Sequence, residues 1–197
     1  MCAAEMKMPG MASELIMDLR GTLEWLKQEG DLMETDHPVD PDIELTAIQK
    51  NMDGSCPILF NNVKGKPNHR AVTNLFGDMN VVNKMFGWAD DVDRTKKLSY
   101  ALDHPLPPVE IGQEEAPCQE VVIEDPVNVN DYIIPIRHTE YEPELTVGSG
   151  NRVVAGKYFD GGTDLGYNRM NFRWGNVGTF QISPGSHMWQ VVSKHYK

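Results

Sequence analysis

A proline-rich stretch near the middle of the chain separates two kinds of hydrophobic pattern, and this separation constrains the fold most. Proline cannot continue a helix and lacks a backbone donor, so the stretch is typical of an exposed connection. Its prolines are Pro105, Pro107, Pro108 and Pro117. We therefore expect a flexible leader over residues 1–18, an N-terminal domain over 19–104, a linker over 105–117 and a second domain over 118–197.

Before this stretch, helical patterns alternate with short apolar runs. Leu19, Leu23 and Leu26 lie at i, i+4 and i+7, and Gly30 is a suitable stop for that helix. Further helices are expected near residues 43–48, 81–86 and 90–100, and strands at Pro57–Phe60 and Ala71–Phe76. This order predicts a small α/β unit.

After the stretch, the pattern has a period of two, and glycines separate the segments. Short strands joined by glycine turns favour a β-barrel or sandwich, so the whole chain is predicted to be α+β. A last helix is expected after Ser183–Ser186, and a barrel that ended at Lys197 would have an open edge. We therefore expect a longer parent protein. The predicted strands are Gln119–Glu124, Tyr132–Arg137, Arg152–Phe159, Asn168–Trp174 and Val177–Ile182.

Charge and cysteine content exclude several classes of protein. The chain has 18 Lys and Arg against 29 Asp and Glu, a net charge of −11, which argues against nucleic-acid and anionic-membrane binding. No apolar run reaches the roughly 18–20 residues of a membrane helix. Cys2, Cys56 and Cys118 form no CxxC pair, so we expect no disulfide, no zinc site and a cytoplasmic location.

Two segments near the C-terminus carry the residue types best suited to bind a ligand. Asp164 could offer a carboxylate to a hard cation, and Arg169 a planar fork to a phosphate or carboxylate. His187, near a predicted helix start, could add an imidazole. Residue type alone also fits structural roles, namely an Asx turn, a surface ion pair and a turn histidine.

Several segments, in their order and spacing, resemble the N-terminal portion of the UbiD-type decarboxylases, which use prenylated FMN. The similar segments are Leu19–Leu26, Val39–Glu44, Pro57–Gly65 and Val72–Gly77. The resemblance runs from about Leu19 to the end of the chain. It implies a small α/β N-terminal domain followed by the start of a split β-barrel of the flavin-reductase type, which holds the cofactor.

The resemblance also implies a set of site residues. The family's cofactor segment, Asn-x-Gly-x-Tyr-Arg, falls on Asp164–Arg169, with Asp164 in place of Asn and Asn168 in place of Tyr. The implied metal ligands are Asp164 and His187, for Mn²⁺ or Mg²⁺, with K⁺ as a further candidate cation. Arg169 is implied as the catalytic residue that orients the substrate acid. The implied cofactor-binding residues are Asp164, Leu165, Gly166, Tyr167, Asn168, Arg169, Ser186 and His187.

The implied activity is the reversible decarboxylation of an aromatic or α,β-unsaturated carboxylic acid, through a covalent adduct with prenylated FMN. The substrate could also be an aromatic acyl-CoA. The third metal ligand and the proton-donor glutamates are expected beyond Lys197, so this chain alone is expected to be inactive. The parent is expected to form a homo-oligomer through a C-terminal domain.

Two alternatives to a decarboxylase remain open at this stage. The first is an aromatic carboxylase, because the same intermediates serve both directions of the reaction. The second is a non-catalytic subunit or flavin-binding module that a separate polypeptide completes.

Overall fold

The contacts within the chain group its residues into two compact units. The computed structural model describes residues 14–107, 109–124, 128–142, 144–155 and 163–195, and it leaves the side chains of residues 14, 149–155, 163–165 and 195 undescribed. The first unit comprises residues up to 38 together with 49–62 and 70–123. The second comprises residues 39–48, 63–69 and 124–197. Two short stretches of the N-terminal half thus group with the C-terminal half, and the linear domain boundaries expected above remain a prediction.

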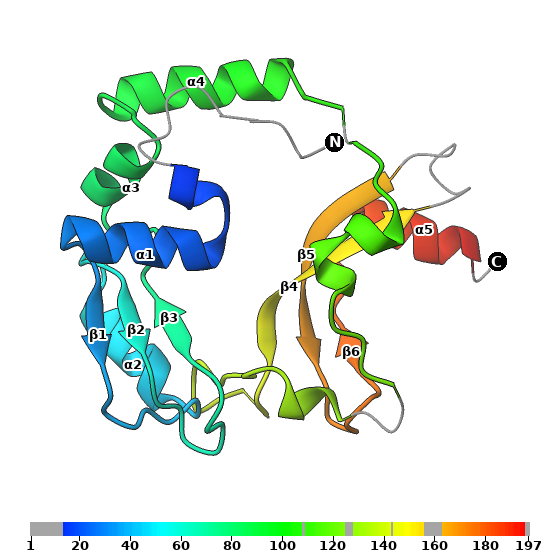
Figure 1. Ribbon diagram of the computed structural model, residues 1–197. Coiled ribbons are helices and arrows are strands. Elements are labelled where there is room, and N and C mark those ends of the chain that lie inside the picture. The colour runs from blue at the N-terminus through cyan, green and yellow to red at the C-terminus, as the bar shows by residue number, and fades with distance from the viewer. Residues whose placement is uncertain (1–13, 108, 125–127, 143, 156–162, 196–197) are drawn as a thin grey trace. The chain divides into compact units, whose positions relative to one another are not determined.

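The first unit is built around a small mixed sheet (Figure 1). Its three strands lie in the order β1–β2–β3, with β1 parallel to β2 and β3 antiparallel to β2. The elements are the 3-10 turn Glu14–Met17, α1 Leu19–Glu29, β1 Met33–Thr35, β2 Ile58–Phe60, β3 Ala71–Thr73, α3 Met79–Met85, α4 Asp91–Asp103 and the 3-10 turns Gln113–Glu115 and Pro117–Gln119. Helix α2, Glu44–Asn51, contributes residues to both units.

Local sequence signals fix both ends of α1. The Asp18 carboxylate accepts a hydrogen bond from the Gly21 N–H at 2.7 Å, which caps the first turn. Gly30 ends the helix with φ of 76°, a left-handed conformation that glycine adopts without a Cβ penalty. The predicted stop at Gly30 is confirmed. The buried face is made by Thr22, Trp25 and Leu26, so it is rotated from the predicted leucine stripe, and Leu19 is exposed.

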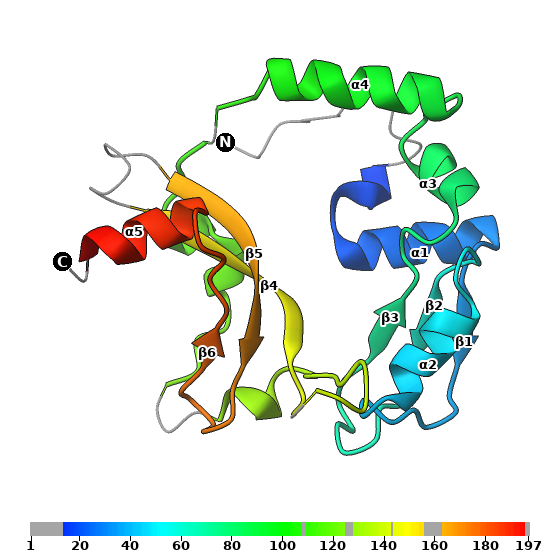
Figure 2. The same ribbon diagram turned by 180° about the vertical axis from the view of Figure 1, so that it is seen from behind.

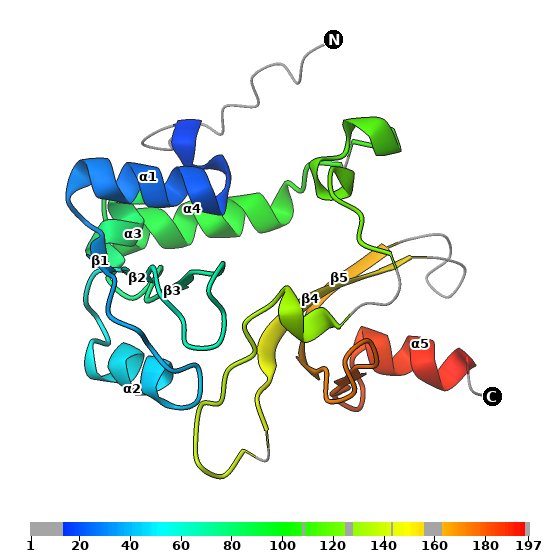
Figure 3. The same cartoon turned by 60° about the horizontal axis from the view of Figure 1, so that its bottom comes forward.

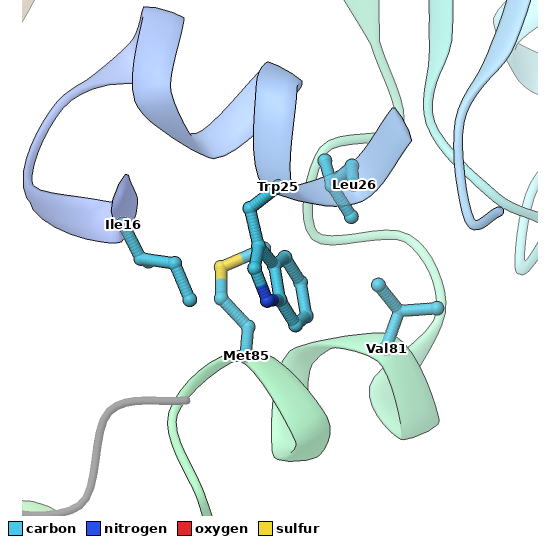
Figure 4. Packing of buried hydrophobic residues seen from close by; sticks show 5 residues of the cluster. All are labelled: Ile16, Trp25, Leu26, Val81 and Met85. Atoms are coloured by element: carbon cyan, nitrogen blue, oxygen red, sulfur yellow. The ribbon is translucent and has the colours of Figure 1, made fainter. Parts of the chain in front are cut away.

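Helices α1 and α3 share the main apolar cluster of the first unit (Figure 4). Ile16 and Met85 point toward the ring of Trp25, and Val81 and Leu26 extend the cluster along the two helices. Each of these five side chains is less than 10% exposed. By contrast, α4 has no buried residue. The cluster therefore supplies apolar burial that α4 does not.

The strand predictions succeed where an apolar run finds a partner. Strands β2 and β3 lie within the runs predicted at Pro57–Phe60 and Ala71–Phe76. The sequence missed β1, a short strand with one apolar residue, Met33, whose parallel partner lies more than 20 residues further along the chain. The strand predicted at Gln119–Glu124 is wrong, because those residues form a 3-10 turn and an unpaired, exposed segment.

The second unit contains an antiparallel sheet of β4 Val147–Ala155, β5 Thr163–Asn171 and β6 Thr179–Phe180, in that order (Figure 2). A 3-10 turn, Val129–Asp131, precedes the sheet, and α5, His187–His195, follows it. Figures 2 and 3 show α5 along one side of the ribbon that β4 and β5 form.

The strand limits in this half differ from those predicted. The strand predicted at Tyr132–Arg137 is wrong, because only Ile136 and Arg137 make isolated bridges there. Pro135 lacks the backbone donor that a longer ladder would need. Strands β4 and β5 each begin about five residues before their predicted starts, and residues 156–159 of the first prediction lie outside the described residues.

The described residues confirm a mixed α/β architecture with two small sheets. That the second sheet is the start of a split β-barrel of the flavin-reductase type stays a prediction. Within the described ranges, no helix combines the length and the apolar character that crossing a membrane requires.

Removing the buried side chain of Leu26 should destabilise the first unit. Leu26 is 0% exposed, so Leu26→Ala should lower the free energy of unfolding by about 2–5 kcal/mol. The matched control is Leu102→Ala on α4, where the side chain is 83% exposed and the expected change is below about 0.5 kcal/mol. Urea unfolding followed by circular dichroism measures both. Equal effects of the two substitutions would contradict this description of the core.

Candidate functional site

Strand β5 carries the whole segment predicted to bind the cofactor. Asp164 pairs with Val154 on β4, and the pairing continues residue by residue to Asn168, which pairs with Gly150. The structure places Asp164 and Leu165 by their backbone only, because their side chains lie outside the described residues. A paired strand fixes the backbone of the segment more firmly than a loop would.

Two hydrogen bonds hold the chain that follows β6 against β5. The Asn168 Nδ2 group donates to the Gln181 carbonyl oxygen at 2.6 Å. The Gln181 N–H donates to the Arg169 carbonyl oxygen at 3.0 Å. Gln181 lies only five residues before Ser186, so these bonds connect the first predicted segment to the second. Tyr167, which precedes Asn168 on β5, is 72% exposed.

Arg169 forms an ion pair whose partner the sequence did not indicate. Its Nη1 atom lies 3.2 Å from Oε1 of Glu142. The Glu142 side chain is only 14% exposed, whereas that of Arg169 is 51% exposed. The other carboxylate oxygen, Oε2, accepts the His138 backbone N–H at 2.6 Å and lies 3.2 Å from Nδ1 of the same histidine. The structural alternative for Arg169, an ion pair, is therefore present, and about half of the side-chain surface of Arg169 stays accessible.

These contacts shift the acidity of Glu142. The His138 backbone N–H is the main cause that holds the pKa of the Glu142 carboxyl below its usual range. The His138 ring and the charge of Arg169 act in the same direction, while burial of the carboxylate opposes them. Glu142 is therefore the ionised anchor of this cluster.

Two further arginines of the second unit pair differently. Arg173 donates through both Nε and Nη2 to the Glu144 carboxylate, at 2.7 and 2.6 Å. Arg137 donates in the same forked manner to Asp42, at 2.6 and 2.9 Å. Both pairs border a cavity of about 450 Å³. The cavity is lined by Pro41, Asp42, Lys66, Asn130, Pro135, Arg137, Glu144, Leu145, Phe172 and Arg173.

Ser186 and His187 lie at the N-terminus of α5, as predicted. The Ser186 Oγ atom accepts the Trp189 N–H at 3.2 Å, and its carbonyl accepts the Gln190 N–H at 3.1 Å, so Ser186 caps the helix. His187 is the first helical residue and is exposed. The unpaired N–H groups and the dipole of a helix N-terminus favour an anion such as a phosphate.

The predicted metal site is only partly described. Among the side chains that the structure describes, no group of three His, Cys, Asp or Glu residues is arranged to hold a metal ion. Of the two predicted ligands, Asp164 lies outside those side chains and His187 within them. The pairing of a carboxylate with an imidazole nevertheless suits a divalent cation such as Mn²⁺. The metal assignment therefore stays a prediction.

Sequence reasoning missed Glu142 and His138. Their separation of four residues could have suggested a local contact, but four-residue spacing has a simple meaning only within a helix. The described turn around Glu142 is not helical. The contact of Glu142 with Arg169 joins residues 27 positions apart, and no spacing rule in a single sequence reports it.

The lowered pKa of Glu142 makes its contribution to stability depend on pH. A depressed pKa means that the contribution is complete above the unfolded pKa of about 4.3 and is lost as the pH falls through the folded value. Glu142→Gln should therefore lower the free energy of unfolding by about 1 kcal/mol at pH 7, and this difference from wild type should shrink at pH 3. Urea unfolding at pH 7, 5 and 3 measures it.

The control for this measurement is Glu140→Gln, at an exposed glutamate that forms no ion pair among the described residues. This control should leave stability unchanged at all three pH values. A Glu142→Gln difference that stays constant between pH 7 and pH 3 would contradict the assigned role of the carboxylate.

The chain is similar to a known protein family and to several curated decarboxylases. Residues 23–102 match the UbiD_N family, described as the 3-octaprenyl-4-hydroxybenzoate carboxy-lyase N-terminal domain. The phenolic acid decarboxylase of Sedimentibacter hydroxybenzoicus is 28% identical over 179 residues, which cover 86% of this chain and 35% of the relative. The gallate decarboxylase of Lactiplantibacillus plantarum is 32% identical over 116 residues, which cover 53% of this chain and 24% of the relative.

A solved structure shows the same fold over most of the chain. It is that of an evolved dimeric form of the UbiD-class enzyme HmfF from Pelotomaculum thermopropionicum in complex with prFMN. The TM-score is 0.78 at 24% identity, over 89% of this chain and 40% of that chain. The present chain spans about a third of the length of the curated phenolic acid decarboxylase. Residues 23–102 therefore match the N-terminal domain of the UbiD family, and the predicted resemblance of the chain to the N-terminal portion of these enzymes is confirmed.

Proposed function

We propose that this chain is part of a UbiD-type enzyme that decarboxylates an aromatic or α,β-unsaturated carboxylic acid with the help of prenylated FMN. The observation that carries the proposal is Arg169, which lies half exposed on β5, opposite a register irregularity in β4, and is held by one ion pair. Relatives named as phenolic acid and gallate decarboxylases are similar in sequence over 86% and 53% of this chain. A free phenolic acid is therefore a better candidate substrate than a coenzyme A thioester.

The residues of the site suit the cofactor and its metal ion. The Ser186-capped N-terminus of α5 offers N–H groups and a positive dipole to the flavin phosphate. His187 and Asp164 would hold a divalent ion, Mn²⁺ or Mg²⁺, which offsets the phosphate charge in a protein of net charge −11. When bound, the modified flavin supplies the electron sink that the loss of CO₂ requires.

Arg169 would bind the carboxylate of the substrate. A guanidinium offers two parallel N–H donors to a carboxylate, which fixes the orientation of the acid as well as its position. The paired backbone of β5 and the contact with Glu142 restrict where this guanidinium can lie. The role of this chain in catalysis is then to orient the acid and to hold the cofactor phosphate.

The cellular setting is part of the same proposal. Cys56 and Cys118 are free thiols, as expected of a protein in the reducing cytoplasm. We place the enzyme there as a homo-oligomer, the assembly implied by its resemblance to the family.

Loss of either proposed metal ligand should remove the metal and the flavin together. We expect Asp164→Ala and His187→Ala, made in the complete protein and purified from cells that supply the modified flavin, to contain little of either. Metal analysis and the flavin absorbance spectrum measure both contents. The control is His37→Ala, an exposed histidine of the first unit, which should retain both. Unchanged metal and flavin in the Asp164 and His187 variants would overturn the ligand assignment.

Replacing Arg169 by lysine tests whether turnover depends on the forked shape of the guanidinium or only on its positive charge. Arg169→Lys keeps the positive charge but loses the planar fork, so turnover should fall roughly 30- to 1000-fold, which corresponds to about 2–4 kcal/mol of transition-state stabilisation. Flavin content, measured in the same samples, should not change. Release of CO₂ from a panel of phenolic and cinnamic acids is the assay.

The matched control is Arg173→Lys, at an arginine whose fork is already closed on Glu144. This variant should stay within about threefold of wild-type turnover. If Arg169→Lys is equally active, Arg169 does not bind the substrate carboxylate.

A further inference from the structure

We propose that Glu142 is a positioning residue, which holds one edge of the Arg169 guanidinium so that the other edge faces the substrate carboxylate. This inference rests on the proposed function of Arg169 and deepens it. Glu142 itself touches neither substrate nor cofactor in this proposal, and it acts only through the arginine.

Glu142 is itself held in place by its own contacts. Its side chain is 14% exposed, and its Oε2 atom accepts the His138 backbone N–H at 2.6 Å. The His138 ring nitrogen Nδ1 lies 3.2 Å from the same oxygen. The backbone N–H of Glu142 donates to the Thr139 carbonyl at 3.2 Å. These contacts occupy Oε2 and leave Oε1 for Arg169.

The contact with Glu142 involves Nη1 of the Arg169 guanidinium. The ion pair joins Nη1 of Arg169 to Oε1 of Glu142 at 3.2 Å. Arg173 and Arg137, in contrast, close both Nε and Nη2 on a single carboxylate. Among the side chains that the structure describes, Arg169 has no second ion-pair partner within 4.0 Å. Arginine has five N–H donors, so Arg169 retains an edge that can accept a carboxylate in the forked geometry.

The backbone of Arg169 is restrained as well. The Gln181 N–H donates to its carbonyl oxygen at 3.0 Å, and its neighbours Asn168 and Met170 are paired with β4 on the other edge. The side chain is therefore restrained at the backbone and at one guanidinium nitrogen. Less conformational entropy remains to be lost when a carboxylate binds, which is how preorganisation improves affinity.

The chain offers a matched control two residues away. Glu144 lies on the same segment and also pairs with an arginine of the sheet region, but it pairs with Arg173. The side chains of Glu142 and Glu144 are similarly shielded, at 14% and 21% exposed. Glu144→Gln therefore removes an equivalent ion pair without changing the partner of Arg169.

The kinetic test compares Glu142→Gln with Glu144→Gln in the complete protein loaded with the modified flavin. We expect Glu142→Gln to lower kcat/KM for gallate and 4-hydroxybenzoate about tenfold, mainly through a higher KM, with flavin content unchanged. Glu144→Gln should stay within about twofold of wild type. A purely structural role would lower the amount of folded enzyme and leave the KM alone.

A binding test that needs no turnover uses benzoate as the probe. The side-chain N–H resonance of Arg169, identified by its loss in Arg169→Lys, should shift as benzoate is added to the wild-type protein. The benzoate Kd should rise about tenfold in Glu142→Gln and stay within about twofold in Glu144→Gln.

The two tests separate failure of the proposed function from failure of this inference. If no aromatic acid is turned over by the wild type, the proposed function fails and the benzoate titration alone decides the role of Glu142. The inference is overturned if benzoate does not shift the Arg169 resonance, or if Glu142→Gln raises the benzoate Kd no more than Glu144→Gln does. Where turnover is measurable, it is also overturned by an unchanged KM in Glu142→Gln.

Discussion

The pairing of β5 on both of its edges is the constraint on which the second unit depends. Strand β4 pairs along most of one edge, and β6 with Gln181 holds the other. Every residue from Asp164 to Arg169 lies on this one strand. Gln181 is hydrogen-bonded to Asn168 and Arg169 and lies five residues before Ser186. A short segment therefore links the predicted cofactor segment on β5 to the start of α5.

Acidic residues in this chain fix arginines in two different ways. Asp42 and Glu144 each close the fork of an arginine, which gives a rigid structural pair at the wall of a cavity. Glu142 forms an ion pair with Nη1 of Arg169 and accepts a hydrogen bond from the His138 backbone N–H. Residue type is the same in the two cases, so only the geometry separates an arginine that completes the structure from one that can still bind a ligand.

Local signals in the sequence predicted the parts of the fold that depend on neighbouring residues. The stop at Gly30 and the strand at Pro57–Phe60 follow from a glycine with positive φ and from a short apolar run. The strand expected at Gln119–Glu124 failed because an apolar run alone does not supply a partner strand. The sequence did not predict strand β1, because only one of its three residues is apolar and its partner strand is distant in sequence.

The candidate site shows the same division between local and distant information. The resemblance to the family assigned Arg169, Ser186 and His187, and the structure places them on β5 and at the start of α5. The resemblance could not reveal Glu142, because a contact between positions 142 and 169 depends on how β5 lies beside the turn after His138. The grouping of residues 39–48 and 63–69 with the C-terminal half is likewise a property of the folded chain.

The central claim is that Arg169 receives the carboxylate of an aromatic acid. The most direct measurement is a crystal structure of the complete protein with the modified flavin and an aromatic acid that it does not turn over. The account predicts that the carboxylate oxygens lie about 2.7–3.0 Å from the guanidinium nitrogens of Arg169, on the edge away from Glu142. A carboxylate bound elsewhere, with Arg169 closed on Glu142 through two nitrogens, would contradict it.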